Sequence, residues 1–276
     1  MNGLSGLHKY SEGLSNTTRM PVLFLGHGSP MNAIEENQFV KGFREIAKTI
    51  PTPKSILCIS AHWFTRGTKV TAMASPKTIH DFYGFPKALF DVQYPAAGNP
   101  ELAKETADLL KPNTVELDDQ WGLDHGAWSV IKHLYPDAEI PVIQMSIDLT
   151  KPPHYHFELA QKLDVLRNKG ILIIGSGNIV HNLRMIDFQG INKVDYGFDW
   201  AREARKTIND YILDGNYQPL LNYQNGGKAL KLAIPTPDHY LPLIYTLGLQ
   251  KQKEAIQLFN DELVAGSISM TSLRIG

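Results

Sequence analysis

Short apolar runs alternate along this chain with longer segments in which apolar residues recur every three or four positions. Buried strands are expected over four of the apolar runs, at residues 21–26, 55–61, 141–147 and 171–175. Amphipathic helices are expected over four of the periodic segments, at residues 35–50, 99–111, 154–169 and 199–214. Alternation of this kind predicts a single α/β domain with a central, mostly parallel sheet flanked by helices.

The remaining stretches are shorter or irregular. Residues 69–73 and the tail at 267–274 look like strands. Residues 75–98 are rich in proline, glycine and aromatic residues, and loops of this length often form lids or pocket walls. Near the end, Thr236 and Pro237 predict the cap and first position of a helix, which would leave His239 in its first turn.

The pattern contains no internal repeat and no break in composition. We therefore predict one α/β domain over residues 20–276, preceded by a flexible leader over residues 1–19 that is rich in Ser, Gly, Asn and Thr. Nothing in the pattern predicts an oligomeric state.

Composition narrows the classes of partner. The 276 residues carry a formal net charge of −1, so no basic surplus points to nucleic acid or to an anionic membrane surface. No apolar run is long enough to predict a membrane span. The only cysteine, Cys58, lies in an apolar run, which suits a buried thiol and a reducing cytoplasm.

Histidine is the residue that suggests chemistry. Five of the ten histidines follow glycine turns, strand ends or the predicted helix start: His27, His62, His125, His181 and His239. If strands 21–26 and 55–61 are parallel neighbours, two of these imidazoles share one sheet edge, where ligands bind in open α/β sheets. Imidazole is the commonest metal ligand, so the set predicts a metal site, although each member alone could be a hydrogen-bonded structural residue.

Other histidines and motifs fit simpler roles. His154 and His156 read as a solvated helix start and His133 as a structural or surface residue, whereas His80 lies in the aromatic loop and could touch a substrate. Ser176 lies in Gly-Ser-Gly-Asn, which is neither a nucleophile elbow nor a complete dinucleotide fingerprint.

Six segments together resemble the class III extradiol ring-cleavage dioxygenases, and within them the DOPA 4,5-dioxygenase branch. These segments are Leu-Phe-Leu-Gly-His-Gly-Ser-Pro-Met, Ser-Ala-His-Trp-Phe-Thr-Arg-Gly, Thr-Ile-His-Asp-Phe-Tyr-Gly-Phe-Pro, Gly-Leu-Asp-His-Gly-Ala-Trp, Gly-Ser-Gly-Asn-Ile-Val-His-Asn-Leu and Pro-Thr-Pro-Asp-His-Tyr-Leu-Pro. The resemblance implies a metal-dependent enzyme that inserts both atoms of O2 into a catechol such as L-DOPA and opens the ring beside the diol.

The resemblance also implies roles for individual residues. His27 and His62 match the two histidine ligands of the metal, and His125 matches a histidine that faces substrate or oxygen. His181 matches the acid/base histidine and is also a candidate fourth ligand, so its role stays open. Where many family members supply a glutamate, this chain has Asp238-His239, so His239 would be the third ligand.

A neutral third ligand suits Fe(II), expected for catalysis, but also Zn(II) in the purified protein. A zinc-dependent hydrolase that uses the same histidines is the alternative, and a binding protein without chemistry is a third reading. The expected substrate pocket is lined by Ser29, His80, Phe82, Tyr83 and Trp128, and Phe85 is a further candidate for its aromatic wall. The expected partners are a small aromatic diol and O2.

Overall fold

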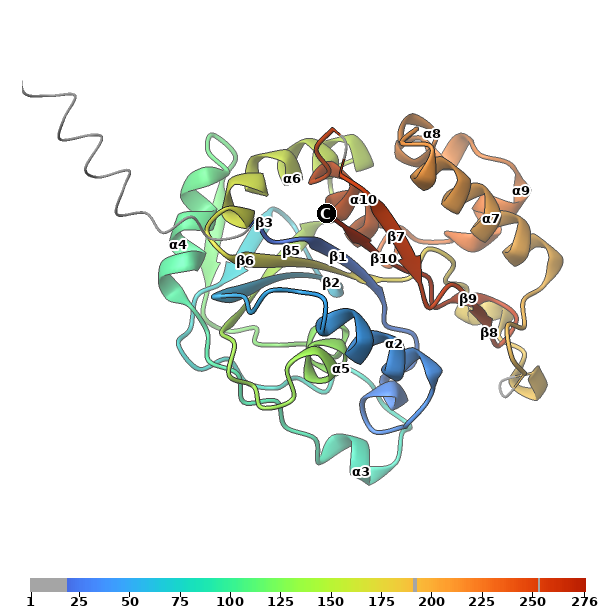
Figure 1. Ribbon diagram of the computed structural model, residues 1–276, viewed down its shortest axis with the longest axis horizontal. Coiled ribbons are helices and arrows are strands. Elements are labelled where there is room, and N and C mark those ends of the chain that lie inside the picture. Colours follow the sequence, from blue (N-terminus) through green and yellow to red (C-terminus); the bar gives the residue numbers. More distant parts are fainter. Residues whose placement is uncertain (1–18, 191–192, 253) are drawn as a thin grey trace, which may run out of the picture.

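The computed structural model describes residues 19–190, 193–252 and 254–276. Its centre is an eight-stranded sheet in the order β4-β3-β5-β2-β6-β1-β10-β7, seen nearly edge-on in Figure 1. Its strands are β1 (Val22–Gly26), β2 (Ser55–Thr65), β3 (Thr68–Thr71), β4 (Val115–Asp118), β5 (Val142–Asp148), β6 (Ile171–Gly177), β7 (Ile256–Phe259) and β10 (Ser272–Ile275). A separate two-stranded ribbon pairs β8 (Leu263–Val264) with β9 (Ile268–Ser269).

The four strands β5, β2, β6 and β1 run parallel, which confirms the predicted mostly parallel α/β sheet. Their side chains alternate between the two faces because successive residues of a strand point to opposite sides. In β1, Val22 and Phe24 enter one hydrophobic core, whereas Leu23 and Leu25 enter the other. Both faces are therefore buried, as the continuous apolar runs require.

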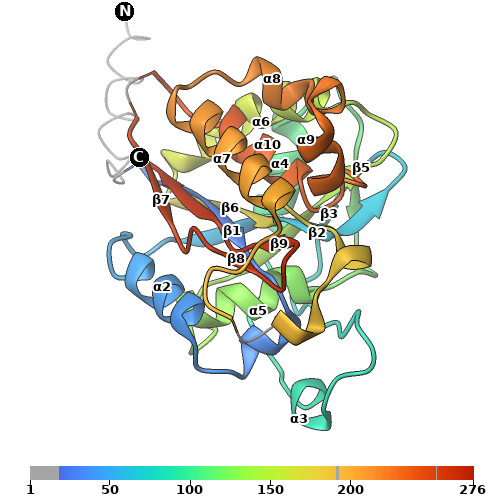
Figure 2. The same ribbon diagram turned by 90° about the vertical axis from the view of Figure 1, so that its right-hand side faces the viewer.

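Helices cover both faces of the sheet. Figures 1 and 2 both place α2 and α5 on one side and α6, α7 and α10 on the other. The α-helices are α2 (Gln38–Ala47), α3 (Lys87–Phe90), α4 (Pro100–Leu109), α5 (His125–Leu134), α6 (Pro153–Arg167), α7 (Asp199–Leu213), α8 (Gln218–Leu221), α9 (Lys228–Ala233) and α10 (Leu241–Gly248). Short 3₁₀ turns are η1 (Pro30–Ala33), η2 (Leu183–Met185), η3 (Phe188–Gly190) and η4 (Tyr223–Asn225). None of the helices in the described ranges has the length and apolarity that crossing a bilayer requires.

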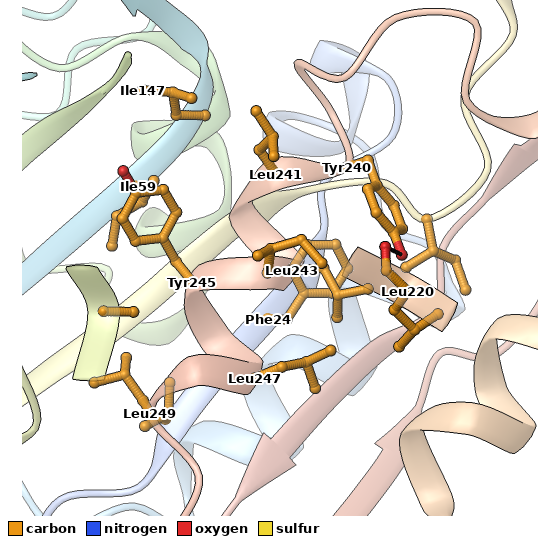
Figure 3. Close-up of a cluster of buried hydrophobic side chains, with 14 of the residues drawn as sticks. Phe24, Ile59, Ile147, Leu220, Tyr240, Leu241, Leu243, Tyr245, Leu247 and Leu249 are labelled. Carbon is orange, nitrogen blue, oxygen red and sulfur yellow. Dashed lines mark hydrogen bonds between the residues drawn. The ribbon is translucent and has the colours of Figure 1, made fainter. Parts of the chain in front are cut away.

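The larger core forms where α10 lies across the sheet. Figure 3 shows Leu243 and Tyr245 of α10 beside Phe24 of β1 and Ile59 of β2. At the edge of this cluster, the buried Tyr240 hydroxyl donates a hydrogen bond to the Leu220 carbonyl oxygen at 3.1 Å. Because Tyr240 follows His239, this packing anchors the segment that carries one of the candidate ligands.

The structure corrects two predictions about strands. β1 and β2 are not neighbours, because β6 lies between them and pairs with both. β2 also runs past residue 61, so His62 lies inside the strand. There β2 advances from Ile59 to Phe64 while β5 advances only from Met145 to Ile147, and this bulge redirects the side chains between them.

The ends of the predicted elements differ as well. The last helix begins at Leu241 instead of at Thr236 and Pro237, so His239 lies in the turn before it. The tail forms β9 and β10 separately. The expected leader over residues 1–18 lies outside the described residues, but Arg19 belongs to the domain, where it forms ion pairs with Asp164 and Glu254.

His156 is not part of a solvated helix start, as its position had suggested. It is fully buried in α6, and its Nδ1 lies 2.9 Å from the Tyr245 hydroxyl of α10. Burial lowers the pKa of His156 to about 4, because the charged ring cannot be hydrated there. The neutral ring therefore belongs to the core that joins these two helices.

We expect this histidine to make folding stability depend on pH. In the unfolded chain a histidine takes up its proton near pH 6.5, so between that pH and about 4 only the unfolded state is charged at this position. The free energy of unfolding should fall with falling pH in that window, by up to about 1.4 kcal/mol per pH unit from this group. Urea denaturation at a series of pH values gives the free energy of unfolding as a function of pH. Its slope between pH 6.5 and about 4 should be shallower for His156→Phe than for the native chain and unchanged for His154→Phe. Equal slopes in all three proteins would contradict the assignment.

Candidate metal centre and substrate cavity

The five predicted histidines converge at the carboxyl edge of the parallel strands. His27 directly follows β1, and its backbone N–H donates to the Gly177 carbonyl oxygen at the end of β6. His62 reaches the same edge through the bulge in β2. The other three come from different elements: His125 begins α5, His181 follows β6, and His239 precedes α10.

Three of the imidazoles form a nearly equilateral triangle. The ring centroids of His27, His62 and His239 lie 5.0–5.2 Å from one another. The Nε2 atoms of His27 and His62 are 3.3 Å apart. Three imidazoles from separate segments thus surround one small volume, as a bound metal ion requires.

The second ring nitrogen of each of these histidines has its own partner. His27 Nδ1 lies 3.0 Å from Ser176 Oγ, which donates its own proton to the Gly126 carbonyl oxygen and must therefore accept from the ring. His239 Nδ1 is hydrogen-bonded to the carboxylate of Asp238. His62 Nδ1 lies 3.3 Å from Asp81 Oδ2.

These contacts assign the proton of each ring to Nδ1, and the Nε2 lone pairs of His27 and His62 then face one another. Partners of this kind orient metal-binding histidines in proteins generally. The donor set therefore fits a divalent metal ion held by nitrogen atoms.

Burial favours the neutral form of His27, His62 and His181. Desolvation, followed by the neighbouring imidazoles, holds the pKa of both His27 and His62 well below the usual histidine range. Burial and the proximity of His239 lower the pKa of His181 to about 3. Burial acts to raise the pKa of Asp238, but the hydrogen bond and charge of His239 outweigh it and lower that pKa. Neutral imidazoles beside an ionised carboxylate are the protonation states that favour metal binding.

His125 lies close to the metal-facing rings from the α5 side. Its ring centroid is 3.9 Å from that of His62, and its Nδ1 is 3.0 Å from Asp81 Oδ2. Asp81 also accepts the backbone N–H of His125, so this one carboxylate touches two of the five histidines. The buried Asp124 caps α5 by accepting the Ala127 N–H, which fixes where His125 begins the helix.

His181 packs against His239. The two rings stack with centroids 3.5 Å apart and an interplanar angle of 11°. Potential ligand atoms of His181, Asp238 and His239 form one cluster, all within 4.8 Å of one another, and those of His27, His62 and His125 form another. The five histidines therefore lie together in the structure. Their ligand atoms fall into two clusters, and the three expected metal ligands are divided between them, with His27 and His62 in one and His239 in the other.

Glycine at the end of β6 allows this convergence. A Cβ atom at Gly177 would lie 2.1 Å from the His239 carbonyl oxygen, and the next residue, Asn178, donates its backbone N–H to that same oxygen. A side chain at position 177 would push the His239 segment away from the strands.

A cavity of about 370 Å³ opens over the histidines. Beside the five imidazoles, its lining residues are Gly28, Ser29, Pro30, Phe85, Leu183, Ile186, Phe188, Val264, Ala265 and Ile268. The size lies within the range of small-molecule sites, which are concave and mostly apolar.

Of the six residues expected in or around the substrate pocket, Ser29 and Phe85 line this cavity. Trp128 is fully buried and donates its indole N–H to the Ile79 carbonyl oxygen. Phe82 packs edge-on against His125 from behind, at 5.5 Å between ring centroids, and His80 contacts the Val92 carbonyl oxygen. Tyr83 is 91% exposed. These four therefore support or surround the site without forming its wall.

The wall that sequence reasoning missed comes from η2, η3 and the β8-β9 ribbon. Its apolar residues carry no recognisable motif, and only their position after the His181 turn could have suggested them. From the long loop at 75–98, Phe85 alone reaches the cavity.

The family described as the catalytic LigB subunit of aromatic ring-opening dioxygenase matches residues 18–268 of this chain. The chain belongs to this LigB family. A 4,5-DOPA dioxygenase extradiol of Escherichia coli (strain K12) is 46% identical over 273 residues, covering 95% of this chain and 97% of that protein. The protein of the same name from Beta vulgaris is 34% identical over 261 residues, covering 92% of this chain and 95% of its own length.

A solved structure agrees with this assignment. The crystal structure of the uncharacterized protein JW3007 from Escherichia coli K12 matches with a TM-score of 0.79 and 42% identity, covering 94% of this chain and all of that one. This LigB-family chain is thus an extradiol aromatic ring-opening dioxygenase, as its sequence motifs predicted. The matched range includes all five histidines of the site.

The second-nitrogen partners should be needed for metal affinity. We expect Asp238→Asn to weaken metal binding about 10- to 100-fold, because the ring of His239 would lose the carboxylate that fixes its tautomer and orientation. Competition with a chelator dye, measured for Fe(II) and Zn(II), gives the affinity directly. Asp210→Asn is the matched control, since Asp210 pairs only with the exposed Lys206 on α7. Equal affinities in the two variants would contradict the role of Asp238.

Proposed function

We propose that this enzyme uses Fe(II) to insert both atoms of O2 into a catechol such as L-DOPA and opens the ring next to the diol to a semialdehyde. The observation that carries the proposal is the triangle of His27, His62 and His239, whose metal-facing nitrogens open into an apolar cavity. The names of the relatives in Escherichia coli and Beta vulgaris support L-DOPA as a first substrate to test.

His27, His62 and His239 would hold the metal, with His181 as a candidate fourth ligand. Bound Fe(II) would supply a Lewis acid for the catechol oxygens and the redox chemistry that O2 requires. Because Asp238 is engaged by His239, the three donors are neutral nitrogens, a set that Zn(II) also accepts. A purified sample that carries zinc would therefore be compatible with iron-dependent catalysis.

The other two histidines would handle protons and oxygen. His181 lines the cavity, where its imidazole would lie within reach of a catechol hydroxyl and could take up its proton and later return it. His125 lines the same cavity beside His62, where it can hydrogen-bond oxygen atoms of the reacting group. The apolar walls would exclude water while the ring opens. A reducing compartment such as the cytoplasm would keep both Fe(II) and the buried Cys58 reduced.

Removal of His181 separates its two candidate roles. We expect His181→Ala to keep its metal and to lose about 10²- to 10⁴-fold in turnover, the usual contribution of a positioned acid or base. Metal content after dialysis and oxygen uptake with a catechol are the two measurements. His154→Ala, at a half-buried histidine in α6, is the control for loss of an imidazole elsewhere. Intact turnover would contradict the acid/base role, and loss of metal would make His181 a ligand instead.

Reconstitution decides between ring cleavage and the alternative of a zinc hydrolase. The metal-free protein is loaded with Fe(II) or Zn(II) without oxygen, and L-DOPA or catechol is then added in air. We expect oxygen uptake and a yellow semialdehyde in equal amounts with Fe(II) only. Absence of uptake with every catechol, together with tight Zn(II) retention, would overturn the proposal and favour hydrolysis.

A further inference from the structure

In the part of the chain that the structure describes, no Lys, Arg, Asp or Glu side chain lines the cavity. Apart from the imidazoles and the Ser29 hydroxyl, every side chain that lines it is apolar. The Ser29 hydroxyl oxygen already accepts a hydrogen bond from the Met31 N–H at 3.2 Å. The part of a substrate beyond the diol would therefore meet hydrocarbon almost exclusively.

This apolar wall is held in place by backbone hydrogen bonds. Asn182 donates its N–H to the Ser267 carbonyl oxygen at 3.1 Å, and Asp187 donates to Ala265 at 2.9 Å. His181 and Ile268 form an isolated antiparallel bridge between the same two segments. The segment 181–187 is thus fastened to the β8-β9 ribbon, so its side chains face the cavity from a fixed framework.

The charged residues near the wall, which include the exposed Arg184 beside Leu183, are not among the residues that line the cavity. Asp187 separates two lining residues, Ile186 and Phe188, but its carboxylate accepts the Tyr196 hydroxyl at 2.7 Å. Lys193 lies over the ring of Tyr196, 4.6 Å from its centroid. The outermost wall residues are large and apolar: Leu183 is 59% exposed and Phe188 is 76% exposed. The hydrocarbon surface therefore continues from the histidines to the solvent.

We propose that the preferred substrates are catechols whose ring substituent is neutral and apolar, such as an alkyl or aryl group, in preference to those with a carboxylate or an ammonium group. The proposal rests on the proposed function, because it takes the diol to lie at the histidines. A charged substituent placed among Ile186, Val264 and Ile268 would lose its hydration without gaining a counter-charge. An apolar substituent would gain by leaving water there.

A matched series of substrates tests the preference. Four catechols share a three-carbon chain or a close equivalent at the same ring position: 4-propylcatechol, dopamine, 3-(3,4-dihydroxyphenyl)propionate and L-DOPA. With the Fe(II)-loaded protein we expect kcat/KM for 4-propylcatechol to exceed that of each charged analogue by about tenfold or more, equivalent to about 1.4 kcal/mol. A value for L-DOPA equal to or above that of 4-propylcatechol would overturn the proposal.

Binding to the Zn(II)-loaded protein separates this proposal from the proposed function. Isothermal titration with the same four catechols should give the same order of Kd without any turnover. If no catechol is cleaved but 4-propylcatechol binds most tightly, ring cleavage fails while the apolar preference stands. If cleavage occurs and the charged catechols bind as tightly, the preference fails while ring cleavage stands.

A charge introduced at the mouth should reverse the order. We expect Leu183→Arg to raise kcat/KM for dihydroxyphenylpropionate relative to 4-propylcatechol by about tenfold, because the guanidinium can pair with the carboxylate. Leu213→Arg is the control, since Leu213 lies on α7 outside the cavity and is 56% exposed, close to the 59% of Leu183. An equal change in both variants would contradict a specific role for the wall.

Discussion

The contact on which the site depends is the 3.3 Å approach of the Nε2 atoms of His27 and His62. Their other nitrogens face Ser176 and Asp81, so two lone pairs point at each other in a buried place. Such lone pairs repel unless a cation or a proton lies between them, and burial disfavours the proton. A metal ion bound between the two rings would therefore relieve this repulsion. The register of the surrounding strands holds the two histidines in place.

That register is set by β6, which separates the two strands that carry these histidines. Gly177 at its end pairs with Gly26 of β1, and both lack the side chain that would keep His239 or the C-terminal segment at a distance. The bulge in β2 then turns His62 toward the same point. A hydrophobic sheet buried on both faces resists slippage, because a shift by one residue would exchange the two cores.

The strands and the convergence of the histidines follow from the sequence because both obey simple rules. Continuous apolar runs predict strands buried on both faces, and residues at the carboxyl ends of parallel strands share one edge. The prediction that strands 21–26 and 55–61 are neighbours was wrong, because β6 lies between them. Nothing in the sequence of either strand indicates that insertion. The prediction of a helix start at Thr236 was wrong. The Asn178 N–H donates a hydrogen bond to the His239 carbonyl oxygen, and this contact holds the segment as a turn.

The cavity wall was harder to predict. Aromatic residues in a long loop favoured Phe82 and Trp128 as wall residues, yet these rings pack with one another and with His125 behind the site. Ordinary aliphatic residues such as Ile186 and Val264 form the wall instead. Their role depends on the contact between the segment around Ile186 and the segment around Val264, almost eighty positions apart in the sequence. The pattern of residues within each segment does not predict that contact.

The site is thus built from two parts of the fold. The sheet edge positions the imidazoles, and residues 182–188 together with the β8-β9 ribbon form the apolar wall. Substitutions in the wall need not disturb the strand ends, since Asp187 is held to Ala265 by a backbone hydrogen bond that a change of side chain leaves in place. Divergence or laboratory selection can therefore exchange the accepted ring substituent residue by residue while the bond-breaking chemistry is inherited intact.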